Sequence, residues 1–178
     1  MSGWISVLGF VLALDGLRIS TLTPTVSGRD RLVGVGVAAA VAVVVALLAE
    51  PVFEAGDVSP ETFRIAAGLI VAAVAVRRLI LGGGQPYTEV PTRWSGLVPA
   101  GFPVALSPEL VAWAASRGVD DLGAALAGIA VAAVVAAVTS QVSIEGVNAR
   151  LGDAWIRLSG AGLGAVAVVL LVDGIRSV

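Results

Sequence analysis

Residues 13–24 read ALDGLRISTLTP and place a carboxylate and a guanidinium inside an otherwise apolar N-terminal stretch. Asp15 and Arg18 are three positions apart, so on a helix they would share one face. The composition of the chain decides which solvent surrounds these charges. Of the 178 residues, 57% are hydrophobic and only 13% are charged, whereas soluble domains carry about 25% charged residues. The sequence therefore predicts an integral membrane protein, because a soluble chain of this size could not bury so much apolar surface.

The composition also excludes several classes of function. Cysteine and histidine are both absent. The chain therefore has no disulfide, no Ser–His–Asp or Cys–His arrangement, and no histidine, which is the commonest metal ligand. The glycine run at residues 82–84 lacks the Lys-Ser/Thr of a phosphate-binding loop. The formal net charge of −2 offers no basic surface to a nucleic acid. We therefore expect no enzyme, no catalytic residue, no metal, no cofactor and no nucleic-acid partner.

Apolar stretches recur along the chain with short polar connections between them. A spanning helix needs about 20 mostly apolar residues, and six such spans are expected, at about 4–26, 32–49, 62–81, 94–116, 121–142 and 154–175. A Gly- and Pro-rich linker at about 82–93 divides the chain into halves of three spans each, about 4–81 and 94–175. The sequence thus predicts a single all-α membrane domain over residues 1–178.

The two halves resemble each other in sequence. Residues 94–117 repeat the helix-with-interruption design of residues 4–27, and FRIAAGLIVAAVAV in the third span resembles IRLSGAGLGAVAVV in the last. Because each half holds three spans, the second would be inverted relative to the first. The sequence therefore predicts an inverted 3+3 repeat with interrupted helices 1 and 4, an architecture that recurs among secondary transporters.

The arginines predict the orientation of the chain in the membrane. With the N-terminus outside, the inner side holds Arg29, Arg31, Arg77, Arg78, Arg93, Arg150 and Arg157, and the outer side holds Arg64, Arg117 and Arg176. This distribution obeys the positive-inside rule. We therefore expect a multi-pass protein of the cell (inner) membrane with both termini outside. Arg77 and Arg78 are expected to reach the inner headgroups by snorkelling.

The candidate binding residues gather at the two interruptions. Aligning the halves places Arg18 opposite Pro108 and beside Glu109. A charge at a helix centre costs about 2.5 to 3.5 kcal/mol, so such groups usually face a cavity or a partner. Arg18 is expected to pair with Asp15, Glu109 or both, while the Thr21 hydroxyl either faces a substrate or bonds the preceding turn. The expected substrate-binding residues are Asp15, Arg18, Thr21, Ser107, Pro108 and Glu109.

The last predicted span carries a packing motif of small residues. Gly160 and Gly164 form G-x-x-x-G, and small residues allow helices to approach closely. The motif could act inside the monomer or between copies, so a homo-oligomer through Gly160 and Gly164 is one expectation.

Three stretches resemble spans of a known family in their original order. VPAGFPVALSPELVAWA (98–114), FRIAAGLIVAAVAVRRL (63–79) and LGDAWIRLSGAGLGAVAVVLLVDGI (151–175) are similar to the fourth, third and last spans of the MarC-related membrane proteins. The likeness covers nearly the whole chain. It implies a six-span inner-membrane protein related to the LysE-type exporter superfamily.

The chain departs from that family in both central motifs. The family's first span usually carries an Asp-Pro start followed by Asn-x-Pro, where this chain reads DGLR at residues 15–18. The family's Gly-Pro-Gly appears here as SPE at residues 107–109. Asp15 and Pro108 therefore match the family pattern, while charged Arg18 and Glu109 stand near positions that are neutral in the family.

The main functional interpretation is a small-molecule transporter or exporter of the MarC-like type, surrounded by membrane lipid and moving a small polar or zwitterionic solute. The alternative is a non-transporting membrane scaffold or lipid-interacting protein whose buried charges form a structural ion pair. The two differ in the environment of the charges. A transporter needs Arg18 to be reachable by solvent, whereas a scaffold would bury the charges in a dry, closed pair.

Overall fold

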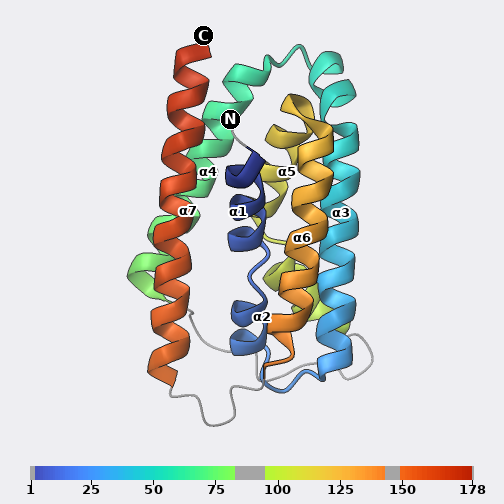
Figure 1. The fold of residues 1–178 in the computed structure, drawn as a ribbon, viewed down its shortest axis with the longest axis vertical. Helices are drawn as coiled ribbons and strands as arrows, with labels where there is room; N and C mark the ends of the chain where they lie inside the picture. The colour runs from blue at the N-terminus through green and yellow to red at the C-terminus, as the bar shows by residue number, and fades with distance from the viewer. Residues whose placement is uncertain (1–2, 83–94, 143–148, 178) are drawn as a thin grey trace.

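The computed structural model describes residues 3–82, 95–142 and 149–177, and these form helices without a strand. The elements are α1 (Gly3–Ala13), α2 (Gly16–Leu22), α3 (Gly28–Ala55), α4 (Pro60–Leu81), η1 (Gly96–Ala105), α5 (Pro108–Asp120), α6 (Leu122–Ser140) and α7 (Ala149–Ser177). They run along one long axis, and both chain ends lie toward the same end (Figure 1). The predicted linker apart from Gly82, and with it Arg93 and Trp94, lies outside the described residues.

The first predicted interruption separates α1 from α2. Asp15 has an extended backbone (φ −78°, ψ 102°), and its side chain accepts a hydrogen bond from the Arg18 backbone N–H at 3.2 Å. A carboxylate in this position satisfies an unpaired N–H of the first helical turn. Asp15 therefore begins a new helix rather than continuing α1, and Figure 1 shows α1 and α2 joined by a short extended stretch.

The second predicted interruption separates η1 from α5. Pro99 and Pro103 lack the N–H that a continuous helix requires, and η1 contains non-helical backbone at Val98 (φ −134°, ψ 121°) and Phe102 (φ −127°, ψ 131°). Pro108 then occupies the first turn of α5, where its missing N–H costs nothing. The two pieces are bent by 66°. Both predicted interruptions are thus confirmed.

The described residues contain four to five helical segments that are long and apolar enough to span a membrane. Four are Gly3–Leu22, Gly28–Ala55, Leu122–Ser140 and Arg150–Ser177, and the bent pair of η1 and α5 makes a fifth when counted as one span. The remaining predicted span, 62–81, coincides with α4, which carries Glu61 and three arginines and falls outside that apolar set. A membrane crossing by α4 therefore stays a prediction.

Large apolar side chains cover the outside of the bundle. Those more than half exposed include Val44, Leu48, Leu69, Ile80, Val134, Val138, Leu158, Val168 and Ile175. These residues belong to α3, α4, α6 and α7. A soluble monomer rarely exposes large contiguous apolar patches. Together with the apolar helices, this surface indicates a membrane protein.

Small residues fill the contacts between helices. Gly118 of α5 lies against the backbone of Ala46 in α3, where an added Cβ would come within 2.7 Å of the Ala46 Cα. Gly160 of α7 packs on α4 in the same way, since a Cβ there would lie 2.9 Å from the Arg78 Cβ. The G-x-x-x-G motif therefore acts, at Gly160, inside the monomer. Association of copies through Gly160 and Gly164 stays a prediction.

Candidate functional site

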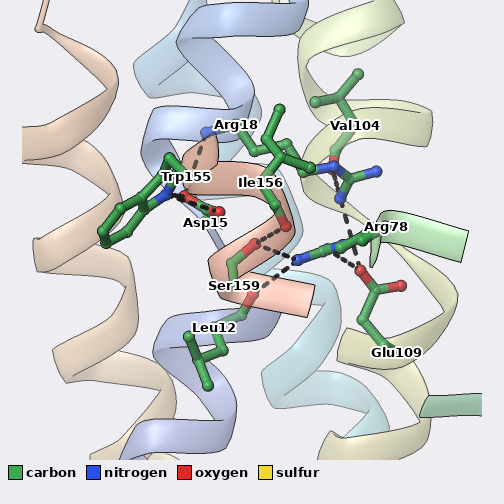
Figure 2. Close-up of polar contacts among 9 residues, drawn as sticks. All are labelled: Leu12, Asp15, Arg18, Arg78, Val104, Glu109, Trp155, Ile156 and Ser159. Atoms are coloured by element: carbon green, nitrogen blue, oxygen red, sulfur yellow. Dashed lines mark hydrogen bonds and ion pairs between the residues drawn. The ribbon is translucent and has the colours of Figure 1, made fainter. Parts of the chain in front are cut away.

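A buried carboxylate joins the two interrupted helices. Glu109 lies in the first turn of α5 and is 1% exposed. Its Oε1 accepts a short hydrogen bond from Arg78 Nη2 of α4 and lies 3.5 Å from Arg18 Nη1 of α2. In Figure 2 a dashed line from each of the two guanidinium groups ends on the same oxygen of the Glu109 carboxylate. The predicted pairing of Arg18 with Glu109 is confirmed, and Arg78 is an additional partner.

The expectation that Arg78 reaches the lipid headgroups is wrong. Its side chain is 4% exposed, whereas the neighbouring Arg77 is exposed. Successive residues of a helix point about 100° apart, so only one arginine of an adjacent pair can face the bundle. Arg78 continues the buried face of α4 formed by Ala67, Val71 and Ala75. That spacing is present in the sequence and is the signal for its burial.

The two arginines also satisfy backbone carbonyls at the helix breaks. Arg78 Nη1 donates to the Leu12 carbonyl at the end of α1 (3.2 Å), and Arg18 Nη1 donates to the Val104 carbonyl at the end of η1 (3.4 Å). The last carbonyls of a helix lack partners within it and carry the negative end of the helix dipole. Each break thus creates a site that favours a cation, and an arginine from another helix occupies it.

The Asp15 carboxylate accepts hydrogen bonds from α7 rather than from the Arg18 guanidinium. Trp155 Nε1 donates to both Asp15 oxygens at 3.1 Å, and the Arg18 backbone N–H donates to one of them (Figure 2). Among the ion pairs of the described residues, none joins Asp15 to the Arg18 guanidinium. The carboxylate therefore fixes the start of α2 and its contact with α7. Trp155 does not appear among the predicted site residues.

Thr21 does not offer a hydroxyl to a substrate in this structure. Its Oγ1 donates to the Leu17 carbonyl at 2.7 Å, and Ser20 Oγ donates to the same carbonyl at 2.9 Å. Both hydroxyls bond the preceding turn, which is the alternative interpretation of Thr21. Its predicted part in substrate binding has no support from these contacts.

The structure assigns different parts to Ser107 and Pro108. Ser107 is 1% exposed and precedes α5 without capping it, and its Oγ is buried with no partner in the described part of the chain. Pro108 is exposed and starts α5. Ser107 therefore retains an unused hydroxyl two residues before Glu109, whereas Pro108 serves to shape the break.

The members of the cluster differ in their access to the surroundings. The side chains of Glu109 and Arg78 are 1% and 4% exposed, but that of Arg18 is 16% exposed. Arg18 makes its side-chain contacts through Nη1 alone, and within the described ranges its Nε and Nη2 have no partner. The cluster thus combines one closed ion pair with one accessible, partly unused guanidinium.

Further arginines close both ends of the bundle. At one end Arg64 of α4 pairs with Asp120 of α5 at 2.5 Å, and Arg117 pairs with the same carboxylate at 2.8 Å. At the other end buried Arg31 donates to the carbonyls of Thr23 (3.0 Å) and Ser140 (3.0 Å). These contacts tie helix ends together, and the partners named here are not members of the central cluster.

No family model, curated protein sequence or solved structure matches this chain. The resemblance to the MarC-related proteins stays a prediction. The positions that match its pattern, Asp15 and Pro108, both stand where a helix begins after a break.

Proposed function

We propose that the protein is a small-molecule membrane transporter of the MarC-like type, related to the LysE-type exporter superfamily, that moves a small polar or zwitterionic solute. One observation carries this proposal. Two interrupted helices bring a partly exposed guanidinium, Arg18, beside a buried carboxylate, Glu109, at their breaks. Transporters commonly bind substrate where corresponding helices break near mid-membrane.

The second arginine favours a binding site over a purely structural lock. Arg78 and Glu109 already form a closed pair, so locking the helices needs no further charge. Arg18 adds a cation whose contacts are all longer than 3.3 Å. An intramembrane charge costs about 2.5 to 3.5 kcal/mol, and such loose contacts offset little of that cost. A solute that binds Arg18 accounts for its presence.

The packing of the helices supports the proposed inverted repeat. If α1, α2, α3 and α4 correspond to η1, α5, α6 and α7, the helix contacts should come in matching pairs. Among the described residues they do, except that α1 contacts α7 without a comparable contact between η1 and α4. α3 packs on η1 and α5 as α6 packs on α1 and α2, and α4 contacts α5 as α7 contacts α2. The pairs α3–α6 and α4–α7 would lie across the symmetry axis. In Figure 1 the chain descends from α1 to α2 and rises from η1 (yellow-green) to α5.

We further propose that the protein lies in the cell (inner) membrane with both termini on the outer side. Three arginines, Arg29, Arg77 and Arg157, are exposed toward the end opposite the termini, which would be the cytoplasmic end. Arg31 and Arg78 are buried, so they no longer count as surface charges at that end. At the end that carries the termini, Arg64 and Arg117 are already paired with Asp120.

Single cysteines in this cysteine-free chain test the orientation. We expect Glu54→Cys and Gly123→Cys to react with a membrane-impermeant maleimide in intact cells, because both positions are exposed near the outer helix ends. Thr25→Cys should react only after permeabilisation. Labelling of Thr25→Cys in intact cells, with Glu54→Cys protected, would reverse the proposed topology.

Transport itself is tested in proteoliposomes loaded with the small-molecule fraction of the source cells. Mass spectrometry should show at least one polar solute leaving faster than from protein-free vesicles. Arg18→Gln should lower that rate about tenfold or more, which corresponds to losing one hydrogen bond to a charged group. The control Arg77→Gln removes the same charge from an exposed neighbour and should leave the rate unchanged. Equal retention by protein-containing and protein-free vesicles would contradict transport.

A further inference from the structure

The two arginines of the cluster use their guanidinium groups differently. Arg78 engages both terminal nitrogens, with Glu109, the Leu12 carbonyl and the Ser159 hydroxyl as partners. Arg18 engages only Nη1, and its contacts of 3.4 and 3.5 Å exceed the usual 2.7 to 2.9 Å of a charge-assisted hydrogen bond. In the described part of the chain, the edge formed by Nε and Nη2 has no partner.

We propose that this free edge of Arg18 binds an oxyanion, the carboxylate or phosphate group of the transported solute. That the oxyanion belongs to cargo rests on the proposed transport function. Parallel N–H groups of one guanidinium match the two oxygens of a carboxylate or phosphate, which a lysine ammonium cannot do. The 16% exposure of the Arg18 side chain, against 4% for Arg78, singles out Arg18 as the arginine that a solute can reach.

Glu109 remains with Arg78 when the oxyanion binds. The Arg78–Glu109 hydrogen bond is short and closed, whereas Glu109 lies at 3.5 Å from Arg18. An oxyanion on Nε and Nη2 therefore needs no rupture of the Arg78–Glu109 pair. It also compensates the trio of Arg18, Arg78 and Glu109, which carries one more positive than negative charge. The nearby Glu109 carboxylate repels the bound anion, which keeps binding weak enough for release.

The first test compares acetate with acetamide, its neutral isostere, on the purified wild-type protein in detergent at constant ionic strength. A ligand that binds the native state raises the midpoint of thermal unfolding. We expect acetate and inorganic phosphate to raise the midpoint in a saturable way and acetamide to leave it unchanged. Equal effects of acetate and acetamide, or no effect of either anion together with no Arg18-dependent effect of phosphatidylglycerol, would overturn the oxyanion site.

Variants of Arg18 test the guanidinium fork. Arg18→Lys keeps the charge and should weaken acetate and phosphate binding about tenfold or more, because the fork is lost. Arg18→Gln should abolish binding, and the control Arg77→Gln should bind as the wild type does. If Arg18→Gln does not fold, Arg18→Lys decides. If Arg18→Lys bound acetate and phosphate with wild-type affinity, the paired N–H groups of the guanidinium would not be what recognises the oxyanion.

Two further arms separate the source of the oxyanion from the function of the protein. Arg18-dependent stabilisation by phosphatidylglycerol, but not by phosphatidylcholine or the soluble anions, would retain the oxyanion site and assign it to a lipid headgroup. Arg18-dependent binding of acetate without flux in proteoliposomes would retain the site and contradict transport. Flux restricted to solutes without an oxyanion, and insensitive to acetate, would retain transport and overturn this inference.

Discussion

Replacing Glu109 with leucine should destabilise the protein by about 3 to 5 kcal/mol, because the change strands a buried guanidinium. Arg78 is 4% exposed and would keep only the Leu12 carbonyl and the Ser159 hydroxyl. Arg78→Met should also be strongly destabilising, since it leaves the Glu109 carboxylate with only the 3.5 Å contact to Arg18. The double variant Arg78→Met/Glu109→Leu should recover most of the loss, because apolar side chains of similar size can replace a buried ion pair with little penalty.

Reversible unfolding in mixed micelles of a mild detergent and dodecyl sulfate measures these differences. Breaking the exposed pair of Arg157 and Asp153 is the matched control, as both side chains are more than 40% exposed. Arg157→Met removes this pair and the hydrogen bond from Arg157 to the Leu79 carbonyl, and because both contacts are exposed it should cost at most about 1 kcal/mol. Additive losses in the Arg78/Glu109 double variant would show that the two charges do not stabilise each other.

The second large effect is expected at Gly118. An added Cβ would lie 2.7 Å from the Cα and 2.8 Å from the carbonyl carbon of Ala46, so α3 and α5 would have to move apart. Overpacking usually costs about 1 to 3 kcal/mol, and rigid backbone cannot yield as a side chain does. We therefore expect Gly118→Ala to lose about 3 kcal/mol in the same unfolding assay.

Gly36 supplies the control for this substitution. It lies in α3, and no atom lies within 4 Å of the position that a Cβ would take there. Gly36→Ala should therefore be neutral or slightly stabilising through the better helix propensity of alanine. A Gly118→Ala variant as stable as Gly36→Ala would contradict the close approach of α3 and α5.

The helix breaks are predictable from the sequence because local residues cause them. Asp15 caps its own helix through a backbone group three residues later, and Pro99, Pro103 and Pro108 act on their own turns. The placement of Arg18 and Glu109 at the breaks follows from the same local pattern. Matching the two halves of the sequence predicts that these two residues meet, and the ion pair between them agrees with that prediction.

The remaining partners depend on how distant helices pack. Arg78 stands at the end of an apolar stretch, which favours a headgroup anchor, but it also lies on the buried face of α4, and packing against the other helices decides between the two. Trp155 reaches Asp15 from 140 positions away along the chain, and no local pattern specifies that contact. The Thr21 hydroxyl is the opposite case, because its partner is local: it donates to a carbonyl one turn earlier in the same helix.

The central claim is that the charge of Arg18 in this cluster serves a solute, and flux through a neutral version of the cluster tests it most directly. The variant Arg18→Met/Arg78→Met/Glu109→Leu removes all three charges, and apolar replacement of a buried ionic triad often keeps or raises stability. We predict that this variant folds with near wild-type stability and gives no flux above protein-free vesicles. Wild-type flux through the folded variant would contradict the claim and leave the charges as a structural lock.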